Sequence, residues 1–566
     1  MDYRLFDSVR RQASPVEADL VDSFAQGRIS RRAFVARGTM IGLSAPLIGA
    51  ILAACGSDSK GTTGGTTAPG GTTAPAGTAA AGAIKQGGTL RIAAQKPAGP
   101  LDPVAMADLG TYTPVVTAFE YLVNTLGSTL SPMLAESWKP NADGTVWTFS
   151  LRKGVKWHDG SAFTADDVVA TLDRLAGSNL KSYISAGSSK KIDDSTVEVT
   201  LSHADGQFPW QVSPYNPQSV ITPKDFVLGT TLDAKPNGTG AFKLTKYEAG
   251  VSAEYTANAD YWGGKPYLDK LQFLFSETLA TMVSGLQGGA ADAIVQFSVV
   301  GGDALLADKN FTVGKIRGSA HRQIWMNTRE GDFTDKRVRQ AVGLGLDRQA
   351  LIDTVLKGLG DIGNDHPISP IYPFFDSGQA QRKRDVAKAK QLLSDAGKAG
   401  LAATMYFPKL QEIPELAQIV QSQLKEIGMN VTLQQEKDVD GEEWCKVYDS
   451  KVEPAGCDGG KDFGIVDYGP RGVPDVYLVK AYATGEWNSA HYISEPFRAA
   501  VKSYQSSLDL AGQQKAIVDI QKIANEDTPY AIPYFYNSLY ANSKKVSGIV
   551  ATGLGHFYCG KAGFTA

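Results

Sequence analysis

From Gly88 to the end of the 566-residue chain, short runs rich in β-branched residues alternate with longer stretches of helical periodicity. No second linker interrupts this alternation, which predicts one α/β assembly of about 480 residues. Residues 145–151 are expected to form a strand, Thr164 to cap a helix, and residues 334–356 to form one helix that stops at Gly358. A chain of this length holds either several domains or one two-lobed body.

An export signal is predicted over residues 1–55. Residues 30–34 read SRRAF, and a run without charged residues follows from Met40 to Ala54. A helix needs about 20 apolar residues to span a bilayer, so this shorter run is interpreted as a cleavable signal segment. The paired arginines resemble a twin-arginine export signal.

Cys55 ends the apolar run, in the sequence LAACG. Small residues before a cysteine resemble a bacterial lipobox, whose cysteine is diacylated and becomes the new N-terminus. Two acyl chains hold a protein stably at a membrane. The sequence therefore predicts a lipoprotein attached through Cys55 to the outer face of the cytoplasmic membrane. The alternative is a buried cysteine in an apolar helix.

Residues 56–87 consist mostly of Gly, Thr, Ala and Pro. A segment of this composition has too little apolar surface to offset the entropy lost on ordering, so we predict a disordered tether. Random-coil scaling gives such a tether a reach of roughly 30 Å.

Three further cysteines are present, namely Cys445, Cys457 and Cys559. Thiols tend to oxidise outside the cytoplasm, and the first two enclose a short polar segment, so a disulfide between Cys445 and Cys457 is predicted. Three cysteines allow three different single bridges, and a pairing that uses Cys559 stays open.

The net charge argues against nucleic-acid binding, and the absence of enzyme motifs argues against catalysis. The formal net charge is −3, which offers no basic surface for a nucleic acid. The sequence contains no phosphate-binding Gly-rich loop, no nucleophile elbow and no paired histidines at metal-ligand spacing. The six histidines are scattered and are interpreted as structural. We therefore predict no catalytic residue, no metal site and no cofactor, and a secreted hydrolase is the weakest alternative.

Four blocks resemble bacterial extracellular solute-binding proteins of the peptide/nickel class, family 5, in that family's order and spacing. They are residues 134–168 with DGTVWTFSLRKGVKWHDG, 238–269 with NADYWGGKPYLD, 335–348 with DKRVRQA, and 387–397 with AKAKQLL. The likeness extends over nearly the whole chain after the tether.

The resemblance implies an α/β, bilobal fold of the large peptide-binding, periplasmic-binding-protein-like type. Two hinge strands, near residues 322–327 and 530–534, would join the lobes. The implied division is lobe I at 88–322 plus 532–566, with an inserted subdomain at about 125–225, and lobe II at 323–531.

The same resemblance implies the solute-binding component of an ABC importer. Such a protein would act as a monomer, capture its ligand between two closing lobes, and deliver it to a membrane permease with its ATPase. A peptide or similar amine-bearing organic solute is the expected ligand. Members of the family also bind oligosaccharides, nickel chelates or haem, and a ligand-sensing lipoprotein is a further alternative.

Asp467, followed by Tyr468, is the expected ligand contact, because peptide-binding members pair the matching aspartate with the α-amino group of the ligand. A charge-assisted bond is strong in a closed, water-poor site. The plain alternative is a solvated loop aspartate. Six further aromatic residues are expected to stack on or shield the ligand, although a core position would explain any one of them: Tyr112, Trp210, Phe297, Trp325, Tyr406 and Trp487.

Overall fold

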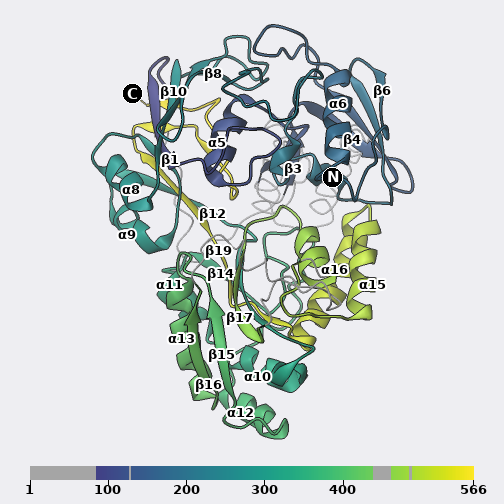
Figure 1. Ribbon diagram of the computed structural model, residues 1–566, viewed down its shortest axis with the longest axis vertical. Helices are drawn as coiled ribbons and strands as arrows, with labels where there is room; N and C mark the ends of the chain where they lie inside the picture. Colours follow the sequence, from purple (N-terminus) through teal and green to yellow (C-terminus); the bar gives the residue numbers. More distant parts are fainter. Residues whose placement is uncertain (1–83, 127–128, 437–460, 484–486, 566) are drawn as a thin grey trace, which may run out of the picture. The chain divides into compact units, whose positions relative to one another are not determined.

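Two seven-stranded sheets organise the chain, and each has its own set of covering helices (Figure 1). The structure is a computed structural model that describes residues 84–126, 129–436, 461–483 and 487–565. We call the part built on the sheet that contains β1 lobe I, and the part built on the sheet that contains β13 lobe II.

The lobe I sheet has the order β12-β20-β11-β1-β10-β9-β8. Its central strand β1 pairs in parallel with β10 and β11, as expected for strands joined by crossovers. Its strands are β1 (Thr89–Gln95), β8 (Phe242–Glu248), β9 (Ser252–Ala257), β10 (Lys270–Ser276), β11 (Ala293–Phe297), β12 (Phe311–Ile316) and β20 (Ser538–Ser543). Its helices are α5 (Leu109–Ala118), α8 (Leu279–Gln287) and α9 (Val299–Ala307).

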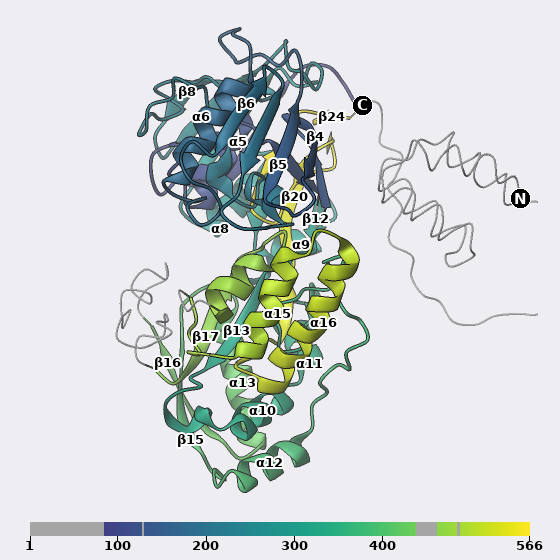
Figure 2. The same ribbon diagram turned by 90° about the vertical axis from the view of Figure 1, so that its right-hand side faces the viewer.

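A four-stranded antiparallel sheet, in the order β4-β5-β7-β6, lies within the sequence of lobe I. Figure 2 shows helix α6 beside it. The predicted strand at 145–151 is β5, and Thr164 precedes α6, where the Asp167 carboxylate accepts the Thr164 backbone N–H at 2.9 Å. The elements are β4 (Ala135–Pro140), β5 (Val146–Leu151), α6 (Ala165–Ala176), β6 (Ser189–Asp193), β7 (Thr196–Thr200), α7 (Phe208–Gln211) and the 3-10 turn η1 (Pro217–Ser219).

Three two-stranded antiparallel sheets complete lobe I. They pair β2 (Val123–Leu126) with β3 (Thr129–Pro132), β21 (Val546–Ser547) with β24 (Gly563–Phe564), and β22 (Val550–Ala551) with β23 (Phe557–Tyr558). The C-terminal segment therefore returns to lobe I.

The lobe II sheet has the order β14-β19-β13-β17-β15-β16, and β18 also pairs with β13. Its strands are β13 (His321–Met326), β14 (Gly360–Ile362), β15 (Ala402–Phe407), β16 (Asn430–Gln435), β17 (Phe463–Tyr468), β18 (Tyr530–Ala531) and β19 (Tyr534–Tyr536). Its helices are α10 (Lys336–Gly345), α11 (Arg348–Val355), α12 (Val386–Asp395), α13 (Ile413–Glu426), α15 (Glu495–Ser506) and α16 (Leu510–Asp527), with the 3-10 turn η2 (Gly331–Thr334) and the π-helix η3 (Tyr477–Ala483).

The predicted continuous helix at 334–356 is wrong, because the structure divides it into α10 and α11. Leu346 has an extended backbone, with φ −81° and ψ 125°. The Asp347 side chain then accepts the backbone N–H of Ala350 at 3.0 Å and so caps a second helix. The helical periodicity of the sequence continues across Leu346 and Asp347, so it did not reveal that Asp347 caps a second helix.

The chain passes between the two sheets twice, at residues 317–320 and at Asn537. The strands predicted as hinge strands are β13 and β18 with β19, and all three pair within lobe II. The buried apolar residues form separate clusters, around Leu90 and Phe273 in lobe I and around Ile324 and Val420 in lobe II. The fold is therefore bilobal, whereas the lobe limits given above stay a prediction.

Candidate ligand site

Asp467 lies on β17 directly opposite Arg322 of β13 in the antiparallel register. The Arg322 side chain is completely buried and pairs with two carboxylates, those of Asp467 and Glu412. It donates from Nε and Nη2 to Glu412 at 2.9 and 3.0 Å. Tyr534 donates to Glu412 at 3.0 Å and Tyr536 donates to Asp467 at 2.8 Å. These residues form a closed polar cluster inside lobe II.

The charge of this cluster does not cancel. Burial alone would lower the pKa of Arg322, but the carboxylates of Asp467 and Glu412 raise it well above its usual value, so the guanidinium stays charged. One positive charge therefore faces two negative ones. Glu412 is 4% exposed and Asp467 is 29% exposed, so the excess negative charge is accessible at Asp467.

The Tyr468 side chain lies on the opposite face of the lobe II sheet from Asp467, because successive residues of a strand point to opposite faces. The Tyr468 hydroxyl donates to the backbone oxygen of Trp487 at 2.8 Å, and the two ring centroids lie 6.1 Å apart. The Lys480 ammonium lies 4.7 Å from the centroid of the Trp487 ring. His321 stacks on Tyr468, and burial lowers the pKa of His321 to about 3, so this histidine is neutral at physiological pH. Two of the predicted aromatics, Tyr468 and Trp487, therefore contact each other, and their contact with a ligand stays a prediction.

The segment after β17 is where the two lobes touch. A Cβ placed on Gly472 would lie 2.2 Å from the Trp210 ring and 2.4 Å from Tyr215, both of lobe I. The hydroxyl of Tyr183 in lobe I donates to Asp475 in lobe II at 3.0 Å. Trp210 therefore contacts lobe II at Gly472, which lies five residues after Asp467 in the sequence.

Four predicted aromatic residues have other surroundings. Trp325 is fully buried beneath β17, where it contacts Gly464, and Phe297 is 4% exposed in the core beside α8 and α9. Tyr112 is half-buried on α5, with ring contacts to His556. Tyr406 lines a separate cavity of lobe II. A ligand contact by any of them stays a prediction.

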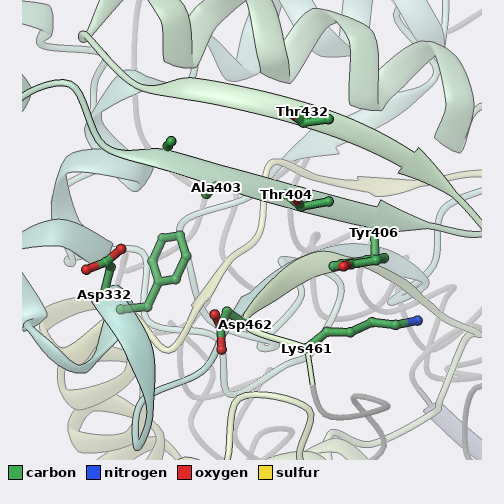
Figure 3. A pocket seen from close by; sticks show the side chains of 9 residues that line it. Asp332, Ala403, Thr404, Tyr406, Thr432, Lys461 and Asp462 are labelled. Carbon is green, nitrogen blue, oxygen red and sulfur yellow. The ribbon is translucent and has the colours of Figure 1, made fainter.

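That separate cavity, of about 380 Å³, is shown in Figure 3. All of its lining residues belong to lobe II, and Thr404 and Thr432 face it from the adjacent strands β15 and β16. The Lys461 ammonium lies 4.6 Å from the Tyr406 ring centroid and also pairs with a carboxylate of its own lobe. Two of its charged residues, Lys461 and Asp332, already have partners of opposite charge in lobe II.

A third candidate is a cavity of about 370 Å³ in lobe I, into which Glu120 is buried. The Tyr261 hydroxyl and the Trp262 indole N–H donate to its two oxygens at 2.9 and 2.8 Å. Burial raises the pKa of Glu120 to about 7 from its usual 4.5, although those hydrogen bonds oppose the rise. The two donors belong to the block NADYWGGKPYLD, and they explain in structural terms why that block contains Tyr-Trp.

Replacing Glu120 with glutamine should change how stability depends on pH. Between pH 4.5 and 7 folded Glu120 keeps a proton that the unfolded chain has lost, so its contribution to stability falls as the pH rises through this window. Relative to Glu120→Gln, the wild type should lose on the order of 3 kcal/mol from pH 4.5 to 7. Denaturant unfolding at several pH values measures this difference, and parallel curves for the two proteins would contradict it.

Sequence reasoning missed Arg322, Glu412 and Tyr536 as members of the cluster. The available signal was the arginine in the predicted hinge strand HRQIWM, because an arginine buried in a sheet needs polar or charged partners. Within the described ranges, no helix is long and apolar enough to cross a membrane, and no group of three or more His, Cys, Asp or Glu side chains is placed to hold a metal ion. Cys559 is buried without a disulfide, whereas Cys55, Cys445 and Cys457 lie outside the described residues.

Two lobes joined by two connections, with a partly exposed carboxylate near their contact, define a two-lobed binding protein. Residues 129–488, well over half of the chain, match the model of bacterial extracellular solute-binding proteins, family 5. The chain belongs to this family.

Three similar proteins support the assignment. Heme-binding protein A of Haemophilus influenzae is 31% identical over 299 residues, which cover 48% of this chain and 54% of that protein. Di/tripeptide-binding protein 2 of Pseudomonas aeruginosa is 28% identical over 469 residues, which cover 74% of this chain and 84% of that protein. The solved structure of HbpA2 from Haemophilus parasuis has a TM-score of 0.72 at 23% identity, with 85% of this chain and 100% of that chain covered, so the fold is shared.

Proposed function

We propose that this protein captures a peptide or another amine-bearing organic solute between its lobes and delivers it to an ABC importer. The partners are a membrane permease and its ATPase, and the solute leaves chemically unchanged. The family assignment supports capture of a solute, and the name of the di/tripeptide-binding relative supports a peptide.

The observation that carries the choice of an amine is the uncancelled negative charge at Asp467. Arg322 has five N–H donors, and it directs three hydrogen bonds to Glu412 and Gln411 and only its Nη1 to Asp467. Asp467 uses its Oδ1 for both Arg322 and Tyr536, which leaves Oδ2 for a ligand. A protonated amine at Oδ2 would complete the charge balance of the cluster and gain a charge-assisted hydrogen bond.

The proposed site combines Asp467 with aromatic residues of both lobes. Tyr468 follows Asp467 on β17 and packs against Trp487, while Trp210 and Tyr112 belong to lobe I. Aromatic faces add apolar contact area without adding charge, which suits ligands with variable side chains. Trp325 lies below β17 and supports the strand that carries Asp467.

Titration calorimetry with di- and tripeptides tests this function. Asp467→Asn should weaken the binding of a peptide by at least about 1.5 kcal/mol, because a hydrogen bond between charged groups is lost. N-acetylated peptides, which lack the amine, should bind the wild type as weakly as free peptides bind the variant. Glu526→Gln, at an exposed acid of the same lobe, serves as the control and should leave affinity unchanged.

Two results would overturn the peptide assignment. Free and N-acetylated peptides binding with equal affinity would remove Asp467 from amine recognition. Stabilisation by haem, a nickel chelate or an oligosaccharide, with none by peptides, would assign a different ligand to the same fold. Haem is included because of the heme-binding relative.

We further propose that the mature protein is a monomeric lipoprotein outside the cytoplasmic membrane, held through Cys55 with residues 56–87 as its tether. Membership of a family of extracellular proteins supports the location. Labelling with radioactive palmitate should mark the wild type and Cys559→Ala but spare Cys55→Ala. Equal labelling of all three would exclude this attachment.

A further inference from the structure

We propose that Asp205 of lobe I and Asp475 of lobe II form a proton-sensitive latch, so that closure of the lobes takes up one proton. This inference rests on the part of the proposed function in which two lobes close around a solute, and it does not depend on which solute is bound. Both carboxyl groups lie where the lobes touch, and each residue is only 1% exposed. Two negative charges in one poorly hydrated contact repel each other, so the closed form favours a proton on one of them.

A close backbone contact joins the lobes beside this pair. The Gly206 backbone N–H of lobe I donates to the Gln505 carbonyl oxygen of lobe II at 3.1 Å. A Cβ placed on Gly206 would lie 2.3 Å from the carbonyl oxygen of Ser507, so a side chain at this position would collide with the other lobe. Asp205 directly precedes Gly206 in the sequence. The contact between the lobes therefore fixes the position of Asp205.

The two carboxyl groups have unequal sets of hydrogen-bond donors. Asp475 accepts the Tyr183 hydroxyl at 3.0 Å and the Gln505 side-chain amide at 2.9 Å. Among the described residues, Asp205 accepts only the Gln207 backbone N–H, at 2.6 Å, and its Oδ2 has no partner. Donors stabilise the charged form of a carboxylate. Asp475 is therefore the better supported anion, and Asp205 is the acid that keeps a proton.

Burial raises the pKa of both carboxyl groups, and the charge of Asp475 raises the pKa of Asp205 further. At Asp475 the two donors and the charge of His203, an exposed side chain, oppose this rise. The other titratable neighbours are Tyr183 and Tyr504, whose pKa values burial raises well above the usual value, so both hydroxyls stay neutral. Within the described ranges neither acid forms a salt bridge. No neighbouring cation therefore removes the need for the proton.

Opening the lobes reverses the effect, because water then reaches both carboxyl groups and each ionises with an ordinary pKa of about 4. Above that value, and below the raised pKa of the closed form, closure takes up a proton that the open form has lost. Binding of a solute, which requires closure, should therefore weaken by roughly tenfold for each unit that the pH rises through this window. The latch would hold the solute more tightly in acid than at neutral pH.

Titration calorimetry on the purified protein, with trialanine as the probe, tests the latch between about pH 5.5 and 7, where neither end of the probe changes its main charge state. Wild type should take up about one proton on binding, which two buffers of different ionisation enthalpy reveal as a difference in heat. Asp205→Asn should take up none, and at about pH 7 it should bind as tightly as wild type does at about pH 5.5, because a neutral amide replaces the protonated acid. Asp475→Asn should lose the pH dependence as well.

Two control variants separate the acid pair from other titrating groups. His203→Gln should keep the pH dependence, which would exclude that exposed histidine as its source. Asp225→Asn, at a lobe I acid whose side chain is 68% exposed, should keep it too. The latch is overturned if wild-type affinity does not change with pH, or if the change persists in both Asp205→Asn and Asp475→Asn. Peptide capture would stand in either case.

Small-angle X-ray scattering without ligand tests the latch independently of the peptide. The radius of gyration of wild type should decrease as the pH falls from about 7 to about 5.5, because protonation favours the closed form. Asp205→Asn should keep the smaller radius at both pH values. If trialanine does not bind but the radius changes as expected, the peptide assignment loses support and the latch stands. A wild-type radius that is independent of pH would overturn the latch.

Discussion

Arg322→Met is expected to lower the free energy of unfolding by about 3–5 kcal/mol, because it leaves buried carboxylates without their cation. Glu412 is 4% exposed and would retain only the Tyr534 hydroxyl and no positive charge. Asp467, directly opposite on β17, would retain the Tyr536 hydroxyl. The like charges of the two acids would then repel each other in a poorly hydrated interior. Denaturant unfolding followed by circular dichroism measures the loss.

Two comparison variants make this prediction specific to burial. Arg337→Met removes an arginine that also pairs with an aspartate, but whose side chain is 48% exposed, so stability should hardly change. Combining Arg322→Met with Glu412→Gln should recover part of the loss, since one of the unpaired charges is gone. Equal effects of Arg322→Met and Arg337→Met, or no recovery in the double variant, would contradict the buried-cluster interpretation.

Gly472→Ala is expected to weaken ligand binding by roughly 5- to 150-fold, because overpacking costs about 1–3 kcal/mol. The added methyl carbon would lie 2.2 Å from Trp210 and 2.4 Å from Tyr215, which are on the other lobe. The clash is relieved when the lobes separate, so the variant should favour the open form. Calorimetry with a bound peptide measures the affinity, while thermal unfolding without ligand should change much less.

Gly469→Ala is the matched control for this variant. It lies in the same segment, and its added methyl carbon would have only the Arg471 guanidinium nearby, at 3.8 Å, which is an ordinary contact. Affinity should therefore stay close to that of wild type. Normal ligand binding by Gly472→Ala would show that the contact does not form on closure. So would a loss of unfolding free energy in the ligand-free protein as large as the loss of binding free energy.

The family blocks were informative because each encodes local structure as well as ancestry. The predicted strand at 145–151 and the cap at Thr164 are confirmed, since both depend on neighbouring residues. The single helix predicted at 334–356 failed for a local reason too. Leu346 and Asp347 break it, and helical periodicity does not reveal a cap that lies between two helices of similar phase.

The aromatic predictions show that residue type alone does not tell a ligand contact from a core position. Phe297, Trp325 and Tyr468 are all buried in hydrophobic clusters, whereas Trp487 is only partly buried at the edge of one. A large aromatic residue suits a ligand pocket and a protein core equally well, because both are apolar and poorly hydrated. Only the packing of the surrounding elements distinguishes these positions.

The sequence by itself determined the alternating α/β pattern and the likeness to family 5, and that likeness implied Asp467 as a ligand contact. These depend on short stretches of chain whose residues specify their own conformation. Tertiary structure decided that Arg322 pairs with both Glu412 and Asp467, and that Gly472 meets Trp210. Arg322 is 90 residues from Glu412 and 145 from Asp467, and Gly472 is 262 residues from Trp210. Contacts at such separations arise from strand register and lobe packing, which no local pattern of residues encodes.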